Sequence, residues 1–101
     1  MNYDEYKHEL NLLQTEFDNK KEQLYSKYAF ANNLVKIGDN VTDHFHTIKV
    51  ESIKVHFDGI LKKPNCVYFG SELTKTGAIK KKNPDNYLYQ CNLTLINGIP
   101  L

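Results

Sequence analysis

Three histidines come closest to a chemical site by type and spacing. His44 and His46 lie two residues apart, so an extended backbone would place both imidazoles on one face, and His56 follows on the next extended segment. Three neutral imidazoles can bind zinc, copper or nickel. However, no carboxylate is clearly placed beside them, and His56 falls in the polar phase of its segment. We therefore expect ordinary exposed or hydrogen-bonded histidines and no metal or other cofactor, with a metal-dependent activity as the lesser hypothesis.

The sequence gives little support for a catalytic function. The sequence contains no GxSxG, HExxH, P-loop or dinucleotide-binding glycine pattern. The neighbouring acids Asp4 and Glu5 belong to the polar face of a predicted helix. Neither Cys66 nor Cys91 has a neighbour in the sequence that would activate its thiol. We therefore expect a protein that is not an enzyme.

Lysines on two predicted loops carry the clearest binding signal. All 13 positive side chains are lysine, and residues 34–101 hold nine of them against six acidic residues, a net charge of +3. Aromatic residues on adjacent strands, including Phe69, alternate with these loops, which is typical of a platform for single-stranded nucleic acid. The candidates are Lys62, Lys63, Lys80, Lys81, Lys82, Tyr68, Tyr87 and Tyr89. The absence of arginine and the small net charge favour the plainer interpretation, a solvated loop beside core aromatics.

The sequence predicts a long helix over residues 2–31, on the N-terminal side of these segments. Apolar residues recur at alternating spacings of three and four, interrupted only at Lys20, which is the pattern of a helical face or a coiled-coil seam. The stripe consists of Tyr3, Tyr6, Leu10, Leu13, Phe17 and Leu24. Asn32 and Asn33 can end the helix, since asparagine tolerates the left-handed cap conformation.

Such a helix is about 45 Å long at 1.5 Å per residue, which is more than a small barrel needs as a lid. One interpretation is that the helix packs along its own barrel and frays at its start. The other is that two or more copies pair through the apolar stripe. We favour self-association into a homo-oligomer, because the stripe would otherwise be an exposed patch.

The segment Thr47–Asp58 predicts the central strand. Apolar and polar residues alternate along it, but the phase slips by one residue at Glu51 and Ser52. A strand keeps one face inward across such a slip only if it carries an extra residue. We therefore expect a long strand with a bulge or sharp bend at this point, in a strongly curled sheet.

The remaining segments complete a small sheet. Turn residues at Gly38–Asp39 and Asp58–Gly59 flank the bent strand, and further strands are expected over residues 65–73 and 87–96. Residues 74–86 read as a mobile connection. If the strands on either side pair about its centre, Cys66 lies near Cys91, and we expect two reduced thiols filling the core, with a regulatory disulfide as the lesser alternative.

The fold class that follows is α+β: one long N-terminal helix and then a small curled antiparallel sheet or SH3-like barrel of four or five strands. We place a helical arm at residues 1–33 and the barrel at residues 34–101, within one compact unit of 101 residues. No apolar run reaches the length of about 20 residues that spans a bilayer, and the polar N-terminus does not resemble a secretory signal. We therefore expect a cytoplasmic protein without membrane attachment.

The order of motifs in residues 34–96 resembles a group of small proteins. These motifs are Val35–Val41 with its Gly-Asp pair, Ile48–Ile53, Pro64–Gly70, a lysine turn and Tyr87–Leu93. They resemble small proteins of Bacteroidetes and of their phages and mobile elements, which look like SH3-like, KOW-like barrels and have no assigned activity. The resemblance implies a barrel fold and raises the hypothesis of a mobile-element or phage-derived inhibitor directed at a host. It transfers no functional residues.

The sequence therefore predicts a non-enzymatic interaction module. We expect it to bind a protein partner through its barrel loops and to self-associate through its helix. The alternative is a weak nucleic-acid-binding module that uses the loop lysines and strand tyrosines.

Overall fold

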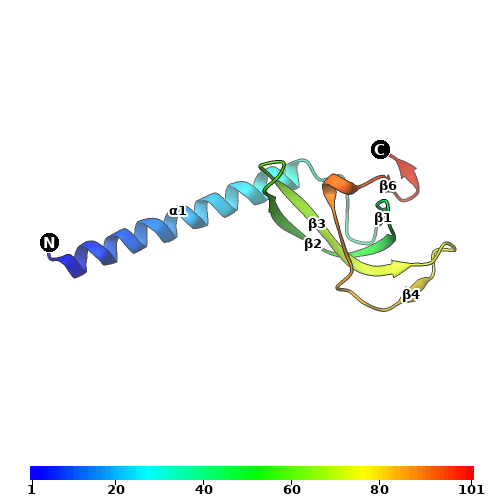
Figure 1. The fold of residues 1–101 in the computed structure, drawn as a ribbon, viewed down its shortest axis with the longest axis horizontal. Helices are drawn as coiled ribbons and strands as arrows, with labels where there is room; N and C mark the ends of the chain where they lie inside the picture. Colours follow the sequence, from blue (N-terminus) through cyan, green and yellow to red (C-terminus); the bar gives the residue numbers. More distant parts are fainter.

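The computed structural model describes residues 1–101, apart from the side chain of Lys81. A single helix, α1 (Tyr3–Ala31), projects from a small curled sheet formed by the rest of the chain (Figure 1). The molecule measures 67 × 26 × 21 Å, and the long dimension is set by the helix. The predicted α+β architecture of one long helix followed by a curled antiparallel sheet is confirmed.

The sheet is antiparallel throughout and runs in the order β4-β3-β2-β1-β6-β7, while β5 also pairs with β3, on the edge that β4 uses further along the strand. Its strands are β1 (Asn40–Thr42), β2 (Thr47–Asp58), β3 (Lys63–Leu73), β4 (Ile79–Lys81), β5 (Tyr87–Tyr89), β6 (Leu95–Ile96) and β7 (Ile99–Pro100). The long β2–β3 hairpin forms the spine, and β3 pairs with β2, β4 and β5. The sheet has seven strands where we expected four or five, because five of them have only two or three residues.

The predicted irregularity in the bent strand is confirmed. Val50 pairs with Gly70 and Ser52 pairs with Phe69, so Glu51 is an extra residue in the β2–β3 ladder. Ile48 and Val50 before the bulge are buried, and Ile53 after it packs against the same core. The extra residue therefore keeps one apolar face inward while the strand bends.

The predicted final strand over residues 87–96 is wrong as a continuous element. The chain leaves β5 at Tyr89, forms a short 3₁₀ helix η1 (Gln90–Asn92), and only then enters β6 beside β1. Gln90 explains the break, because its Oε1 accepts a hydrogen bond from the Cys66 backbone at 3.0 Å and its Nε2 donates to the Asn32 carbonyl at 2.8 Å. The expected loop at residues 74–86 also contains a strand, β4.

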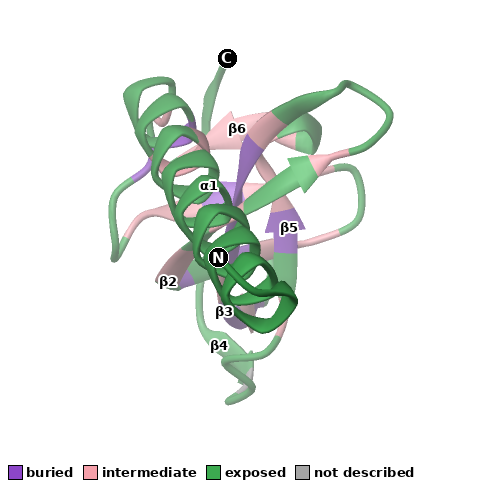
Figure 2. Cartoon of the chain, turned by 90° about the vertical axis from the view of Figure 1, so that its left-hand side faces the viewer, coloured by how far each residue is buried: buried purple, intermediate pink, exposed green. Residues whose placement is uncertain are grey.

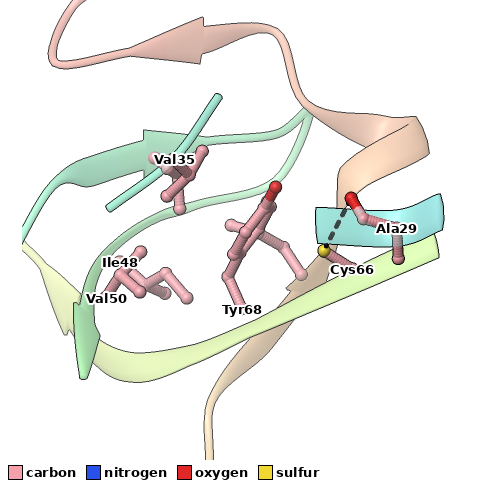
Figure 3. Packing of buried hydrophobic residues seen from close by; sticks show 8 residues of the cluster. Ala29, Val35, Ile48, Val50, Cys66 and Tyr68 are labelled. Carbon is pink, nitrogen blue, oxygen red and sulfur yellow. Dashed lines mark hydrogen bonds between the residues drawn. The ribbon is translucent and has the colours of Figure 1, made fainter. Parts of the chain in front are cut away.

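The core lies between the inner face of the sheet and the end of α1. Tyr68, Ile48 and Leu88 are among its largest fully buried side chains, and Ala29 supplies the helix's one buried residue (Figure 3). The full buried cluster is Ala29, Val35, Val41, Ile48, Val50, Cys66, Tyr68 and Leu88. The end of the helix and the sheet thus share one core.

Hydrogen bonds fix the segment that joins the helix to the sheet. The buried Tyr68 hydroxyl donates to Asn33 Oδ1 at 2.6 Å, and burial raises the pKa of Tyr68 well above its usual value. The Asn33 side chain also accepts from the Val35 amide at 3.0 Å and donates to the Val35 carbonyl at 2.8 Å. The helix does end at the predicted asparagines, but Asn32 has a φ of −102° and is not left-handed. Its side chain instead donates to the Tyr28 carbonyl at 2.9 Å.

Most of α1 has no contact with the sheet. Nearly all of the helix carries the colour of exposed residues in Figure 2, which views the molecule from the N-terminal end. Asn2 begins the helix by accepting a hydrogen bond from the Glu5 amide at 2.8 Å. Despite its length, α1 is not apolar enough to cross a membrane.

The two cysteines do not both fill the core as we expected. Cys66 is buried, and its thiol lies 3.5 Å from the Ala29 carbonyl oxygen, whereas Cys91 is exposed. The register explains the difference: Val67 pairs with Tyr89, so Cys66 lies beside Gln90 and Cys91 falls one position further along, in η1. Both thiols are free.

We predict that Gly70→Ala strongly destabilises the fold. A Cβ at residue 70 would collide with the backbone carbonyl of Lys49 on the neighbouring strand, beside the bulge. Overpacking of this kind costs about 3 kcal/mol, to be measured by chemical denaturation. Gly59→Ala is the matched control, because a Cβ there meets no atom within 4 Å. Equal stability of the two variants would contradict the close approach.

Candidate interaction surfaces

The apolar stripe of α1 is exposed along its whole length. Its six members are 50–70% exposed: Tyr3, Tyr6, Leu10, Leu13, Phe17 and Leu24. Side chains of this kind in a monomeric protein are usually scattered singly, and a contiguous patch marks an interaction site. The interpretation in which the helix packs along its own barrel therefore fails for this part of α1.

The helix docks on the sheet with a different face. Tyr25 stacks on Phe57 of β2 with ring centroids 5.1 Å apart and planes inclined by 25°, and Ala29 enters the core. At about 100° per residue, Tyr25 and Ala29 lie roughly 100° and 140° around the helix from Leu24. The sheet therefore attaches on the side away from the stripe and leaves the stripe accessible.

The structure separates the two lysine groups that we expected to act together. Lys62 and Lys63 lie at the β2–β3 turn, whereas Lys80 belongs to β4 at the other end of β3. The intervening part of β3 is about 30 Å long at about 3.3 Å per residue. Lys82 follows β4 in the chain, and the Lys81 side chain lies outside the described structure. Lys62 and Lys63 thus do not form one basic patch with Lys80.

Tyr68 must be removed from the candidate binding residues. It is completely buried and bonded to Asn33, so its ring is not accessible to a ligand. Tyr87 and Tyr89 lie on the other face of the sheet, with their ring centroids 5.6 Å apart. They are joined there by Phe69, whose ring centroid is 6.1 Å from that of Tyr87.

His44 and His46 line the same hollow beside the β1–β2 loop, whereas His56 lies on the outer face of the sheet. His46 Nδ1 lies 3.2 Å from Asp43 Oδ1, while the His56 ring packs 5.4 Å from that of Tyr89. His44 lies in the loop between β1 and β2, beside a surface hollow. Within the described residues, no group of three or more histidine, cysteine, aspartate or glutamate side chains is placed to hold a metal ion.

The loop between β1 and β2 presents an aromatic residue that sequence reasoning missed. Phe45 is 91% exposed, yet the loop around it is ordered by Asp43, whose Oδ1 accepts hydrogen bonds from the Phe45 and His46 amides at 2.8 Å each. Hollows of about 530 and 480 Å³ flank the loop. Burial works against the charged form of Asp43, but these hydrogen bonds and the adjacent imidazole together lower its pKa.

Lys54 is a further residue that the sequence-based candidates omitted, and His56 was among them only as a possible metal ligand. The polar phase of β2 indicated that both face away from the core, and they do lie on the outer face with Tyr89. What the sequence could not show was the strand on the far side of β3 that brings the tyrosines beside them. Phe45 gave no periodic signal, because it lies in a loop.

Comparisons with protein-family models, with curated proteins and with solved structures found no match to this chain. The surfaces must therefore be interpreted from their own geometry.

We predict that acid destabilises the fold in part through Asp43. Because its pKa is lowered in the folded protein, its stabilising effect is present above the unfolded value of about 3.9 and is lost as the pH falls through the folded value. Asp43→Asn keeps an oxygen that can accept the two amide hydrogen bonds but has no charge. The variant should show a smaller loss of unfolding free energy between about pH 5 and pH 2, measured by denaturation at several pH values.

The matched control is Asp85→Asn, whose carboxylate accepts no hydrogen bond among the described contacts. An unchanged pH dependence in the Asp43 variant would contradict the role assigned to this carboxylate.

Proposed function

We propose that this protein is a non-enzymatic interaction module that self-associates through α1 as a parallel two-stranded coiled coil. The observation that carries the proposal is the accessible apolar stripe on a 29-residue helix that docks on the sheet through a different face. Isolated helices are only marginally stable in water, and most helix stability comes from packing an apolar face. A second copy of the same helix supplies such packing.

The stripe fits the heptad pattern of a coiled coil. Tyr3, Leu10, Phe17 and Leu24 occupy successive a positions, and Tyr6 and Leu13 occupy d positions. Because the sheet attaches about 100–140° around the helix from this seam, two helices can meet along it while both sheets stay on the outside. Pairing through the seam therefore requires no rearrangement of either barrel.

Charges beside the seam favour a parallel arrangement. The e positions carry Lys7 and Lys21, and the g positions carry Glu9 and Glu16. In a parallel pair, each g residue faces an e residue of the partner, so Glu16 would meet Lys21 of the second helix. An antiparallel pair would instead bring e beside e and g beside g, which places like charges together.

Lys20 is the polar exception within the seam. It occupies a d position and its Nζ lies 2.9 Å from Glu16 Oε1 on the same helix. A single polar residue in a seam weakens association but restricts register and the number of strands. In a two-stranded coil the lysine stem can lie along the apolar surface while its ammonium group reaches water.

We predict that Leu13→Glu makes the protein monomeric without unfolding the barrel, because it places two carboxylates face to face in the seam. Leu12→Glu is the matched control: residue 12 is similarly exposed, at 56% against 63%, but lies off the seam. Lys20→Leu should tighten association by roughly tenfold or more, since it replaces a charge with an apolar group. Sedimentation equilibrium measures all three.

A cysteine cross-link distinguishes the orientations. In a Cys91→Ser background, mild oxidation of Leu10→Cys should link two chains, because parallel helices place both copies of residue 10 together. In an antiparallel pair centred on residue 17 the two positions would be about 20 Å apart, beyond the reach of a disulfide. Monomeric wild-type protein at high concentration would refute the proposal. If Leu12→Glu weakened association as much as Leu13→Glu, the assignment of the contact to the apolar stripe would be refuted.

A specific observation also supports the expected protein partner at the barrel loops. Phe45 is an exposed aromatic residue held in an ordered loop between two hollows. Aromatic residues of this kind are typical anchors of protein–protein interfaces. We place the partner-binding anchor at Phe45. The role of a host-directed inhibitor from a phage or mobile element stays a prediction.

We predict that Phe45→Ser lowers the amount of partner that the tagged full-length protein captures from an extract of its native host. The aromatic anchor is lost while Asp43 still orders the loop. Ile60→Ser is the matched control, since Ile60 is 94% exposed on the β2–β3 turn. Capture that is unchanged by the Phe45 variant, or reduced equally by both, would contradict the anchor.

A further inference from the structure

The outer face of the sheet carries a cluster of aromatic and basic side chains that plays no part in the core. Its members are Lys54, His56, Val67, Phe69, Tyr87 and Tyr89, and together they line a shallow hollow of about 300 Å³. We call this the aromatic face. It is separate from the exposed stripe of α1, but Tyr87 and Tyr89 also line the hollow of about 480 Å³ beside Phe45.

Strand register places these residues side by side. Phe69 pairs with Ser52 on one side and Tyr87 on the other, and Val67 pairs with Lys54 and Tyr89. The neighbouring row, Ile53, Tyr68 and Leu88, points into the core. Because side chains alternate between the two faces of a strand, the aromatic face must point to solvent.

The rings form a stepped array. The ring of Tyr87 lies between those of Phe69 and Tyr89, with centroid distances of 6.1 and 5.6 Å, and His56 continues the array 5.4 Å beyond Tyr89. Tyr87 is 51% exposed, whereas Val67 beneath the rings is 6% exposed. The rings therefore rest on a packed floor and remain open to solvent.

The charge on this face is suited to an anion. The Lys54 ammonium lies 5.2 Å from the centroid of the Phe69 ring, so a positive group stands over the aromatic array. Among the described residues, no acidic side chain lines this hollow, although Asp85 lines the adjoining one beside Tyr87 and Tyr89. A ligand with flat rings and regularly spaced negative charges would match both features.

We propose that the aromatic face binds single-stranded nucleic acid by stacking unpaired bases on Tyr87, Tyr89 and Phe69 while Lys54 contacts a phosphate. Stacking on aromatic side chains tolerates any base, because every base has a flat π face. This site replaces the dispersed loop lysines as the basis for nucleic-acid binding. A proline-rich peptide can also lie on aromatic rings, but it lacks the negative charge that Lys54 would meet.

The test is fluorescence anisotropy of the full-length protein with a labelled single strand of about 12 nucleotides, as RNA and as DNA. We expect binding that weakens as salt rises from about 50 to 200 mM. Tyr87→Ala and Tyr89→Ala should each weaken binding roughly tenfold, whereas the Tyr→Phe variants at both positions should retain it. Lys54→Gln should lower the slope of log affinity against log salt concentration by about one, which corresponds to the loss of one phosphate contact.

Ile60→Ala is the matched control, because Ile60 is an exposed apolar residue on the β2–β3 turn and outside the aromatic face, and this variant should bind like the wild type. Thermal unfolding of every variant shows whether the fold is retained, and the phenylalanine variants keep the test valid if an alanine variant unfolds. Absence of binding at low salt, equal affinity for a duplex of the same sequence, or binding insensitive to both tyrosines overturns the proposal. Binding of a proline-rich peptide without nucleic-acid binding also overturns it.

The site is independent of self-association. The monomeric Leu13→Glu variant should still bind a short single strand, while a longer strand that reaches both barrels of a dimer should favour the wild type through avidity. If the chain proves monomeric but binds single strands with the expected tyrosine dependence, only the coiled-coil proposal fails.

Discussion

A buried hydrogen bond between the Tyr68 hydroxyl and Asn33 fixes how α1 leaves the sheet. The phenol reaches across the core to the first residues after the helix, and the Gln90 side chain holds the adjacent Asn32 carbonyl. These contacts, with the stacking of Tyr25 on Phe57, determine which helical face meets the barrel. The apolar stripe is left exposed on another face, so its accessibility depends on a junction at the C-terminal end of the helix.

The bulge at Glu51 has a similar role for the sheet. It keeps the apolar side chains of β2 on the inner face of the sheet after the bend, and it places Ser52 beside Phe69. Gly70 makes this possible, because its lack of a side chain lets the Lys49 carbonyl approach. The bend therefore has two consequences: a continuous inner core from Ile48 to Val55, and an outer face on which Lys54 and His56 meet the aromatic rings.

The aspartates contribute to this design through geometry more than through charge pairing. Asp39, Asp43 and Asp58 each accept backbone amide hydrogen bonds in a turn that borders β1 or β2. For Asp39 and Asp58, those amides are the main reason why the carboxyl pKa is lowered. Among the described residues, ion pairs between lysine and acidic side chains are limited to Glu16–Lys20 and Glu72–Lys80. Surface pairs of this kind stabilise a fold little, so the turns and the core packing contribute more to the stability of the fold.

The sequence alone determined the elements whose signals are local: the helix and its stripe, the bulge in β2, and the turns at Gly38–Asp39 and Asp58–Gly59. Hydrophobic periodicity and turn-forming residue pairs involve neighbouring residues, so these elements could be predicted from the sequence alone. Tertiary structure decided what depends on distant pairing: the break at Gln90, the burial of Tyr68, the separation of the lysine groups, and the outer aromatic face. Each of these follows from strand register or from side-chain contacts between separate elements, for which the spacing of residue types carries no signal.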